Sequence, residues 1–218
     1  SKYSKYAYLK SVSNATLTNR KLLKSINKEY IILMDPIINL DSSIFFTFDD
    51  ECMVCMQALI TGPKDTPYDS GCLIFDILIP NDYPNCPPKV LFKNNGGMRF
   101  NPNLYNCGKV CLSLLGTWHS GKDEGWIPNL STIKQVGISI QSLILVENPF
   151  FNEPSYEKSM NTPKGDRNND KYNMNIKLYN MRHTIYETFS NPPESFKDII
   201  LKHFKLKKDY ILKICKEW

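Results

Sequence analysis

The sequence predicts an α+β protein in which an N-terminal helix precedes a four-stranded antiparallel meander sheet, and a long loop then leads to C-terminal helices. Two observations predict this order. Apolar residues recur at helical spacing over residues 20–33 and again from residue 131 onward. Between these stretches, four short β-rich runs are separated by turns that contain Gly, Pro and Asp, which favours successive antiparallel hairpins.

The first helix is expected over residues 20–33, RKLLKSINKEYIIL, and Pro36 marks its exit. One stripe of this helix carries the large apolar side chains Leu22, Leu23, Ile26, Tyr30 and Leu33. The four strands are expected in the runs SIFFTFDD, CMVCMQALITG, GCLIFDILIP and KVLFK, at residues 43–50, 52–62, 71–80 and 89–93.

Residues 98–125 show little periodicity and are expected to form a long ordered loop. A helix follows at residues 131–146, STIKQVGISIQSLILV, with Ser131 as its expected N-cap. Its apolar positions lie at helical spacing: Ile133, Val136, Ile140, Leu143 and Ile144.

The C-terminal part begins with the polar stretch NTPKGDRNND at residues 161–170, which is expected to be mobile. Two helices are expected at about 171–190 and 193–217, separated by Pro192 and Pro193. The predicted organisation is a partly flexible N-terminal extension, a core, and a helical extension that packs on or follows this core, at residues 1–19, 20–160 and 161–218.

Composition narrows the class of protein. The chain has 218 residues, 42% of them hydrophobic, and a scattered net charge of +5, which gives no indication of nucleic-acid binding. No segment is apolar enough to span a membrane, and the N-terminus lacks the apolar core of a signal peptide. The odd number of cysteines, seven, favours free thiols and an intracellular location. Cys52 and Cys55 fall in a predicted strand, where positions three apart face opposite sides, so a zinc site is not expected.

Three motifs carry a resemblance to a known family. The run NPNLYNCGKVC at residues 101–111 is similar to H-P-N-x-x-x-x-G-x-x-C, the active-site string of the ubiquitin-conjugating (E2) enzymes. Residues 60–92 resemble the family's strand signature, and WIP at 126–128 resembles its W-x-P. The resemblance covers residues 20–160 and implies the E2 (UBC) fold with an active-site loop. Asn101 stands where most of the family has histidine. With this asparagine and with its C-terminal helices, the chain is similar to the large E2–E3 hybrid enzymes.

The resemblance implies that Cys111 is the nucleophile that holds ubiquitin as a thioester, a role that suits sulfur because a thioester is activated towards amines. Asn103 matches the asparagine of the family string. Its amide is expected either to stabilise the oxyanion formed during transfer or to brace the loop, and the two roles are compatible. Asn101 is expected to brace the loop through its own amide, and Tyr105 to pack over it.

The family further implies an activity and a set of partners. The expected enzyme accepts ubiquitin from the E1 activating enzyme and transfers it to a lysine of a protein substrate, with E3 ligases as further candidate partners. No bound cofactor is expected, because E1 consumes the ATP. Two other classes compete: a non-catalytic ubiquitin-binding adaptor, against which Cys111 argues, and a thiol hydrolase, for which the chain offers no Cys/His motif.

The sequence leaves the proton acceptor for the incoming lysine open. Asp123 and Glu124 lie in a segment that looks like an insertion relative to short E2 enzymes. Glu147 and Glu153 lie where the family keeps an acidic or polar gate for the amine, and Glu153 is the candidate of the two. His119 is a further alternative, although a histidine beside a tryptophan is more often a packing residue.

Overall fold

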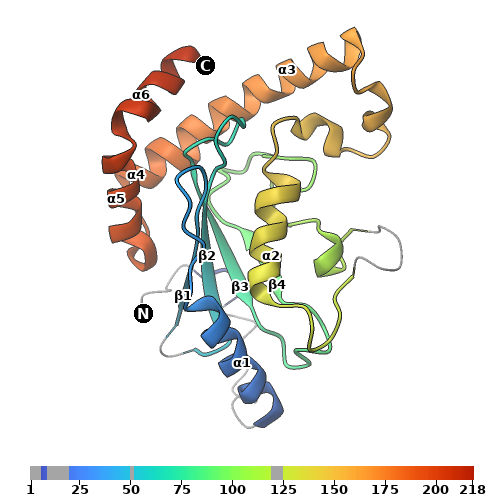
Figure 1. Cartoon of the computed structure of the whole chain (residues 1–218), viewed down its shortest axis with the longest axis vertical. Coiled ribbons are helices and arrows are strands. Elements are labelled where there is room, and N and C mark those ends of the chain that lie inside the picture. Colours follow the sequence, from blue (N-terminus) through green and yellow to red (C-terminus); the bar gives the residue numbers. More distant parts are fainter. Residues whose placement is uncertain (1–5, 9–19, 50–51, 119–124) are drawn as a thin grey trace.

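The computed structural model describes residues 6–8, 20–49, 52–118 and 125–218. Its centre is an antiparallel sheet in which each strand pairs with the next one along the chain, so the predicted meander is confirmed (Figure 1). The strands are β1 (Ile44–Phe48), β2 (Cys55–Thr61), β3 (Cys72–Leu78) and β4 (Lys89–Phe92).

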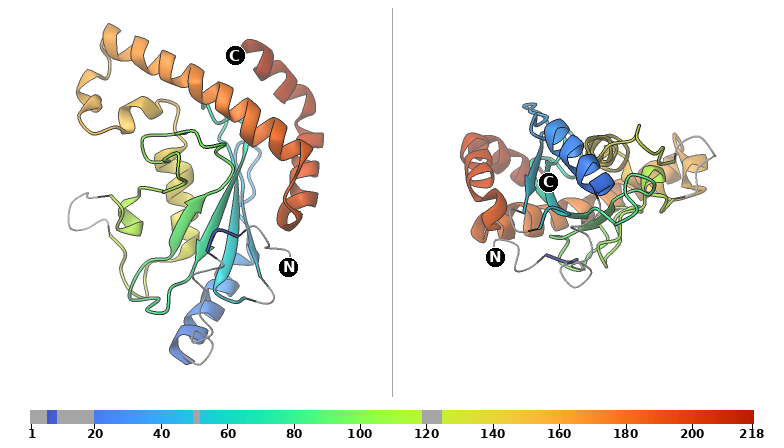
Figure 2. Two further views of the ribbon diagram at one scale, coloured as in Figure 1. Left: turned by 180° about the vertical axis from the view of Figure 1, so that it is seen from behind. Right: turned by 90° about the horizontal axis from the view of Figure 1, so that it is seen from below.

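Helices cover both faces of the sheet (Figures 1 and 2). The first face packs against α1 (Arg20–Leu33) and α2 (Ile133–Ser139), and the second packs against α5 (Lys197–Leu206) and α6 (Lys208–Glu217). Alternate residues of each strand point to opposite faces, and every residue of β2 and β3 is therefore buried. The stripe expected in the first helix covers this sheet. The stripe expected at residues 131–146 also does so, except for Leu143, which is 60% exposed.

The stretch at residues 161–170 is helical, so the prediction of a mobile segment there is wrong. Helix α3 (Pro163–Tyr179) begins directly after Thr162, whose hydroxyl accepts a hydrogen bond of 3.1 Å from the Gly165 amide. Pro163 occupies the first helical position, where the missing N–H costs nothing. The cap and the proline start the helix despite the polar composition. It continues through the π-helical turn η7 (Asn180–Glu187) into α4 (Thr188–Ser190).

Two other helix boundaries differ from expectation. The N-cap of α2 is Thr132, which forms a reciprocal capping box with Gln135, whereas the Ser131 hydroxyl accepts a hydrogen bond from the Ile127 amide. The α2 segment then widens into the π-helical turn η4 (Ile140–Ile144). The expected helix 193–217 is interrupted at Lys207, which separates α5 from α6.

Cys52 does not lie in a strand, which corrects the geometry assumed for the Cys52–Cys55 pair. The Cys55 amide donates 2.8 Å to the Cys52 carbonyl, so the two residues close a tight turn before β2. Within the described residues, no group of three or more His, Cys, Asp or Glu side chains could hold a metal ion.

Short 3-10 turns complete the described elements: η3 (Ser113–Leu115), η5 (Pro149–Asn152), η6 (Tyr156–Ser159) and η8 (Glu194–Phe196). Ile176 of α3 and the buried Tyr6, which lies in the expected N-terminal extension, both belong to the large buried apolar cluster of the protein. The division of the chain at residues 19 and 160 stays a prediction. Across the described residues, no helix combines the length and the apolar character needed to cross a membrane.

Candidate active site

The loop that carries Cys111 docks on the free edge of β4. Lys109 forms a β-bridge with Leu91, and the Phe92 amide donates 2.8 Å to the Gly108 carbonyl. Gly108 has φ +86°, and a Cβ at this position would lie 2.5 Å from the Phe92 carbonyl oxygen. Only glycine permits this close approach, which fixes the course of the chain immediately before the cysteine.

Asn101 is fully buried and holds the loop to its surroundings, so the bracing role expected for it is confirmed. Its Nδ2 donates 2.9 Å to the Tyr68 hydroxyl and 2.8 Å to the Ile144 carbonyl. Its Oδ1 accepts 2.8 Å from the Asn103 amide and 3.4 Å from Asn152 Nδ2. One amide side chain therefore ties the start of the loop to the end of η4.

Asn103 and Cys111 pair reciprocally. The Cys111 amide donates 2.8 Å to the Asn103 carbonyl, and Asn103 Nδ2 donates 2.9 Å to the Cys111 carbonyl. In this arrangement the side-chain amide braces the backbone that carries the thiol. The same Nδ2 carries a second N–H beside the cysteine, and turning this group toward an oxyanion works against the bond to the Cys111 carbonyl.

The Cys111 side chain lines a hollow in the described part of the surface. The residue is 2% exposed and lies on a recess of about 190 Å³. Asn103 and Asn152 supply two amide groups to its lining, whereas Leu143 and Trp118 supply apolar walls. A narrow recess of this kind suits an extended peptide end better than a bulky side chain. The other lining residues are Leu112, Ser113 and Ile144.

Tyr105, which was expected to pack over the loop, lies close enough to Cys111 for the thiol to affect its ionisation. The influence of the nearby Cys111 sulfur is the main cause that raises the pKa of the Tyr105 phenol. The Arg99 guanidinium lies 4.9 Å from the centre of the Tyr105 ring, and the Lys109 ammonium lies 5.8 Å from it. Two cations therefore flank the phenol.

Arg99 links this tyrosine to the candidate gate residue. Its Nη2 lies 3.0 Å from a carboxylate oxygen of Glu153 and donates 2.8 Å to the Pro102 carbonyl. The side chains of the ion pair are 47% and 34% exposed, so both are at the surface of the site. Arg99 was not identified from the sequence alone. Its position, two residues before the motif that begins at Asn101, was the one feature of the sequence that pointed to the site.

The other candidate proton acceptors are not brought to Cys111. Glu147 is exposed and lines a separate polar hollow with residues of α3 and α6. His119, Asp123 and Glu124 lie outside the described residues. The histidines of the C-terminal helices are engaged elsewhere, because His183 pairs with Glu187 and His203 contacts the Ser70 carbonyl.

The loop that carries Cys111 is docked on the last strand of a meander sheet and braced by asparagines. This arrangement fits an enzyme that uses the thiol as its nucleophile. The family model described as ubiquitin-conjugating enzyme matches residues 27–180. The chain therefore belongs to the ubiquitin-conjugating enzyme family.

Individual relatives agree with this assignment. The chain is 44% identical over 217 residues to the human dual E2 ubiquitin-conjugating enzyme/E3 ubiquitin-protein ligase BIRC6, covering 98% of this chain and 4% of that protein. It is 43% identical over 202 residues to the probable ubiquitin-conjugating enzyme protein 17 of Caenorhabditis elegans, covering 91% of this chain and 28% of that protein. The chain thus spans a minor part of these relatives.

A solved structure gives the same result. The E2 domain of a Toxoplasma gondii ubiquitin-conjugating enzyme matches with a TM-score of 0.51 and 27% identity. The match covers 75% of this chain and 97% of that one. The predicted α+β E2 fold is confirmed, and so is the similarity to E2–E3 hybrid enzymes.

Proposed function

We propose that this chain accepts ubiquitin from an E1 enzyme as a thioester on Cys111 and transfers it to the amine of a substrate lysine. The observation that carries the proposal is the placement of Cys111 on a narrow recess, paired with Asn103, in a chain of the ubiquitin-conjugating family. The recess suits the extended carboxyl end of a protein, and sulfur suits an acyl group that must be both accepted and released.

The charging step exchanges one thioester for another. The Cys111 thiol gives up its proton, and its sulfur attacks the carbonyl carbon of the ubiquitin–E1 thioester. The new carbon–sulfur bond forms as the bond to the E1 sulfur breaks, and the released E1 thiolate takes up a proton. Because both bonds are thioesters, the step is close to balanced in free energy and requires no bound cofactor here. ATP is consumed earlier, by E1.

The transfer step passes through an oxyanion. A neutral lysine amine attacks the thioester carbonyl, and Asn103 Nδ2 donates to the oxygen that becomes negative. The carbon–sulfur bond then breaks, and Cys111 leaves as a thiolate that takes up a proton, close to the Tyr105 phenol. The amine loses its extra proton to water or to Glu153, whose carboxylate Arg99 holds beside this site.

The partners follow from this activity. We propose ubiquitin, an E1 enzyme and protein substrates, with E3 ligases as further partners; the name of the human relative BIRC6, a dual E2/E3 enzyme, supports a chain that combines both roles. We propose an intracellular setting, which the described cysteines, all of them free, support.

A charging assay tests the proposal. The chain is incubated with E1, ATP and ubiquitin and then separated on a non-reducing gel. We expect one thiol-sensitive ubiquitin adduct that is lost in Cys111→Ala and becomes a thiol-resistant ester in Cys111→Ser. Cys107→Ala is the matched control, because Cys107 is an exposed thiol of the same loop that should be dispensable.

The same assay separates the competing classes. An adaptor would bind ubiquitin without any adduct on wild-type chain, and a hydrolase would consume the thioester without passing ubiquitin to added lysine. An adduct that persists in Cys111→Ala and disappears in Cys107→Ala would overturn the assignment of the nucleophile.

A further inference from the structure

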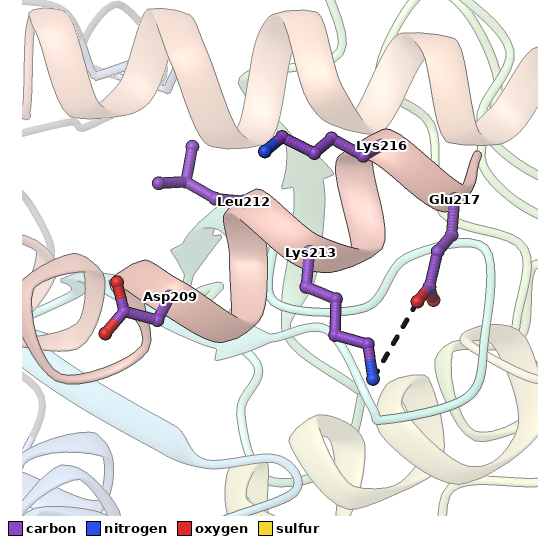
Figure 3. Close-up of a pocket in the computed structure, with 5 residues that line it drawn as sticks. All are labelled: Asp209, Leu212, Lys213, Lys216 and Glu217. Atoms are coloured by element: carbon purple, nitrogen blue, oxygen red, sulfur yellow. Dashed lines mark ion pairs between the residues drawn. The ribbon is translucent and has the colours of Figure 1, made fainter.

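The outer flank of α6 carries a shallow hollow that does not form a binding site. Its lining comes from that single helix, as Figure 3 shows: Asp209, Leu212, Lys213, Lys216 and Glu217. Lys213 and Glu217 form an ion pair of 3.8 Å one helical turn apart, and both side chains are exposed. The charges along this flank are mixed in sign and indicate a solvated surface.

A groove of a different kind lies between α5 and the β1 edge of the sheet, and it is called the α5 groove below. It has a volume of about 470 Å³. Its lining combines the loop before β1, the strands β1 and β2, and α5: Ile38, Asn39, Leu40, Ser43, Phe45, Thr61, Ile199, Lys202, His203, Leu206 and Lys207. Helix α5 covers the sheet face opposite α2 (Figures 1 and 2), so the sheet separates this groove from the core behind the Cys111 loop.

Large apolar side chains at the rim of the groove face solvent. Leu40 is 89% exposed, Leu206 is 75% exposed and Ile38 is 73% exposed. Soluble proteins rarely gather exposed apolar side chains around a concave surface unless another molecule covers them. Single exposed apolar side chains need no explanation, but three around one groove indicate a binding surface.

The polar groups near the floor are already paired. The Ser43 hydroxyl donates to the Asn39 carbonyl at 2.9 Å and accepts from the Asn39 amide at 3.1 Å. The Ser43 amide donates 2.7 Å to the Thr61 hydroxyl. A ligand that excludes water therefore leaves these Ser43 and Thr61 groups paired, so an apolar side chain can cover them at little cost.

The charge of the lining has one sign. Lys202 and Lys207 are its ionised side chains, and neither forms an ion pair within the described part of the chain. Burial lowers the pKa of His203, whose ring contacts the Ser70 carbonyl, so this residue adds no charge at neutral pH. The carboxylate nearest in sequence, Asp41, follows Leu40 but does not line the groove.

We propose that the α5 groove binds a short segment of a partner protein that carries two large apolar side chains flanked by carboxylates. The apolar side chains pack against Leu40, Phe45 and Leu206, and the carboxylates pair with Lys202 and Lys207. Because the groove and the Cys111 recess share no lining residue, a docked partner leaves the thiol free. The site is a docking surface beyond the proposed chemistry.

Peptide display tests the proposal. Random peptides of about a dozen residues are selected on the intact 218-residue chain, and the same library is selected on the Leu40→Asp/Leu206→Asp double variant. We expect wild-type selections to be enriched in Leu, Ile or Phe next to Asp or Glu, and this enrichment to be absent on the double variant. Circular dichroism and thermal unfolding confirm that the variant is folded.

The selected peptides then give two quantitative tests by fluorescence anisotropy. Leu206→Asp alone should weaken binding at least about tenfold, whereas Leu178→Asp, an equally apolar exposed position on α3, should change it by less than about twofold. The Lys202→Glu/Lys207→Glu variant should prefer peptides in which lysine replaces the acidic residues.

Three results would overturn the proposal. Selected peptides could lack acidic residues, or bind the double variant as well as wild type. Alternatively, sedimentation could reveal a dimer that Leu40→Asp dissociates, in which case a second copy of this chain occupies the groove. The charging assay on the same variants is independent of all three, because none of the substituted residues lies at the Cys111 recess.

Discussion

Replacement of Asn103 by alanine distinguishes the two roles expected for its amide. Asn103 Nδ2 donates 2.9 Å to the Cys111 carbonyl, so in the resting chain the amide is a brace. If the amide only braces the loop, Asn103→Ala removes one hydrogen bond and the consequence is loss of stability. If the amide also moves to the oxyanion during transfer, the same substitution slows aminolysis far more than it destabilises the fold.

The magnitudes separate the two cases. A net hydrogen bond contributes about 0.5–1.5 kcal/mol of stability, which corresponds to a fall in Tm of about 1–6 °C for a chain of this length. An oxyanion donor lowers the barrier by about 2.7–4 kcal/mol. Subtracting about 0.5–1.5 kcal/mol for release from the Cys111 carbonyl leaves about 1.2–3.5 kcal/mol. We therefore expect transfer to slow by about 10- to 400-fold.

The assay measures discharge of the preformed Cys111 thioester to free lysine, so that charging by E1 does not enter the rate. Asn94→Ala is the matched control: its amide accepts from the Ile74 amide and donates to the Cys72 carbonyl and the Thr188 hydroxyl, all away from the recess. It should lower Tm without changing discharge. A discharge rate of Asn103→Ala within about twofold of wild type, with a lowered Tm, would refute the oxyanion role.

Three further predictions follow from buried or paired groups. Asn101→Ala leaves the Asn103 amide and the Ile144 carbonyl without their partner, so the free energy of unfolding in urea should fall by about 2–6 kcal/mol. Asn101→His keeps a ring donor and acceptor and should lower it less. Equal losses in the two variants would contradict the bracing role. Arg99→Gln should change the free energy of unfolding by less than about 1 kcal/mol, because the ion pair with Glu153 is exposed. It should shift the pH–rate profile of discharge to higher pH, because the unpaired Glu153 carboxylate favours the protonated form of the lysine amine. Arg99→Lys should restore the profile, and an unshifted profile in Arg99→Gln would exclude this effect. Burial raises the pKa of Glu29 above its ordinary 4.5, so just above pH 4.5 the folded chain keeps a proton that the unfolded chain has released. The free energy of unfolding of wild type, relative to that of Glu29→Gln, should therefore fall as pH rises above 4.5. A difference that does not depend on pH would disprove the shift.

Several elements of the fold follow from local sequence patterns. The four β-rich runs gave the order and direction of the strands, because short turns between them leave an antiparallel neighbour as the simple pairing. The stripe from Leu22 to Leu33 gave α1. The start of α3 was also encoded locally, since Thr162 and Pro163 form a standard cap, but the polar composition of the following residues concealed it.

Other features depend on side chains that meet from distant parts of the chain. Arg99 and Tyr105 lie in one loop, whereas Glu153 comes from the end of η5. No spacing pattern predicts that one guanidinium contacts both this phenol ring and this carboxylate. The same holds for the α5 groove, whose walls are contributed by β1 and α5.

The sequence by itself determined the strand order, the family motifs and the candidate nucleophile, because each of these depends on residues close together in the chain. Tertiary packing decided how deep Cys111 lies, which atom the Asn103 amide contacts and which apolar surfaces remain uncovered. These properties depend on long-range packing, where burial and hydrogen-bond partners are set by the whole fold rather than by local periodicity.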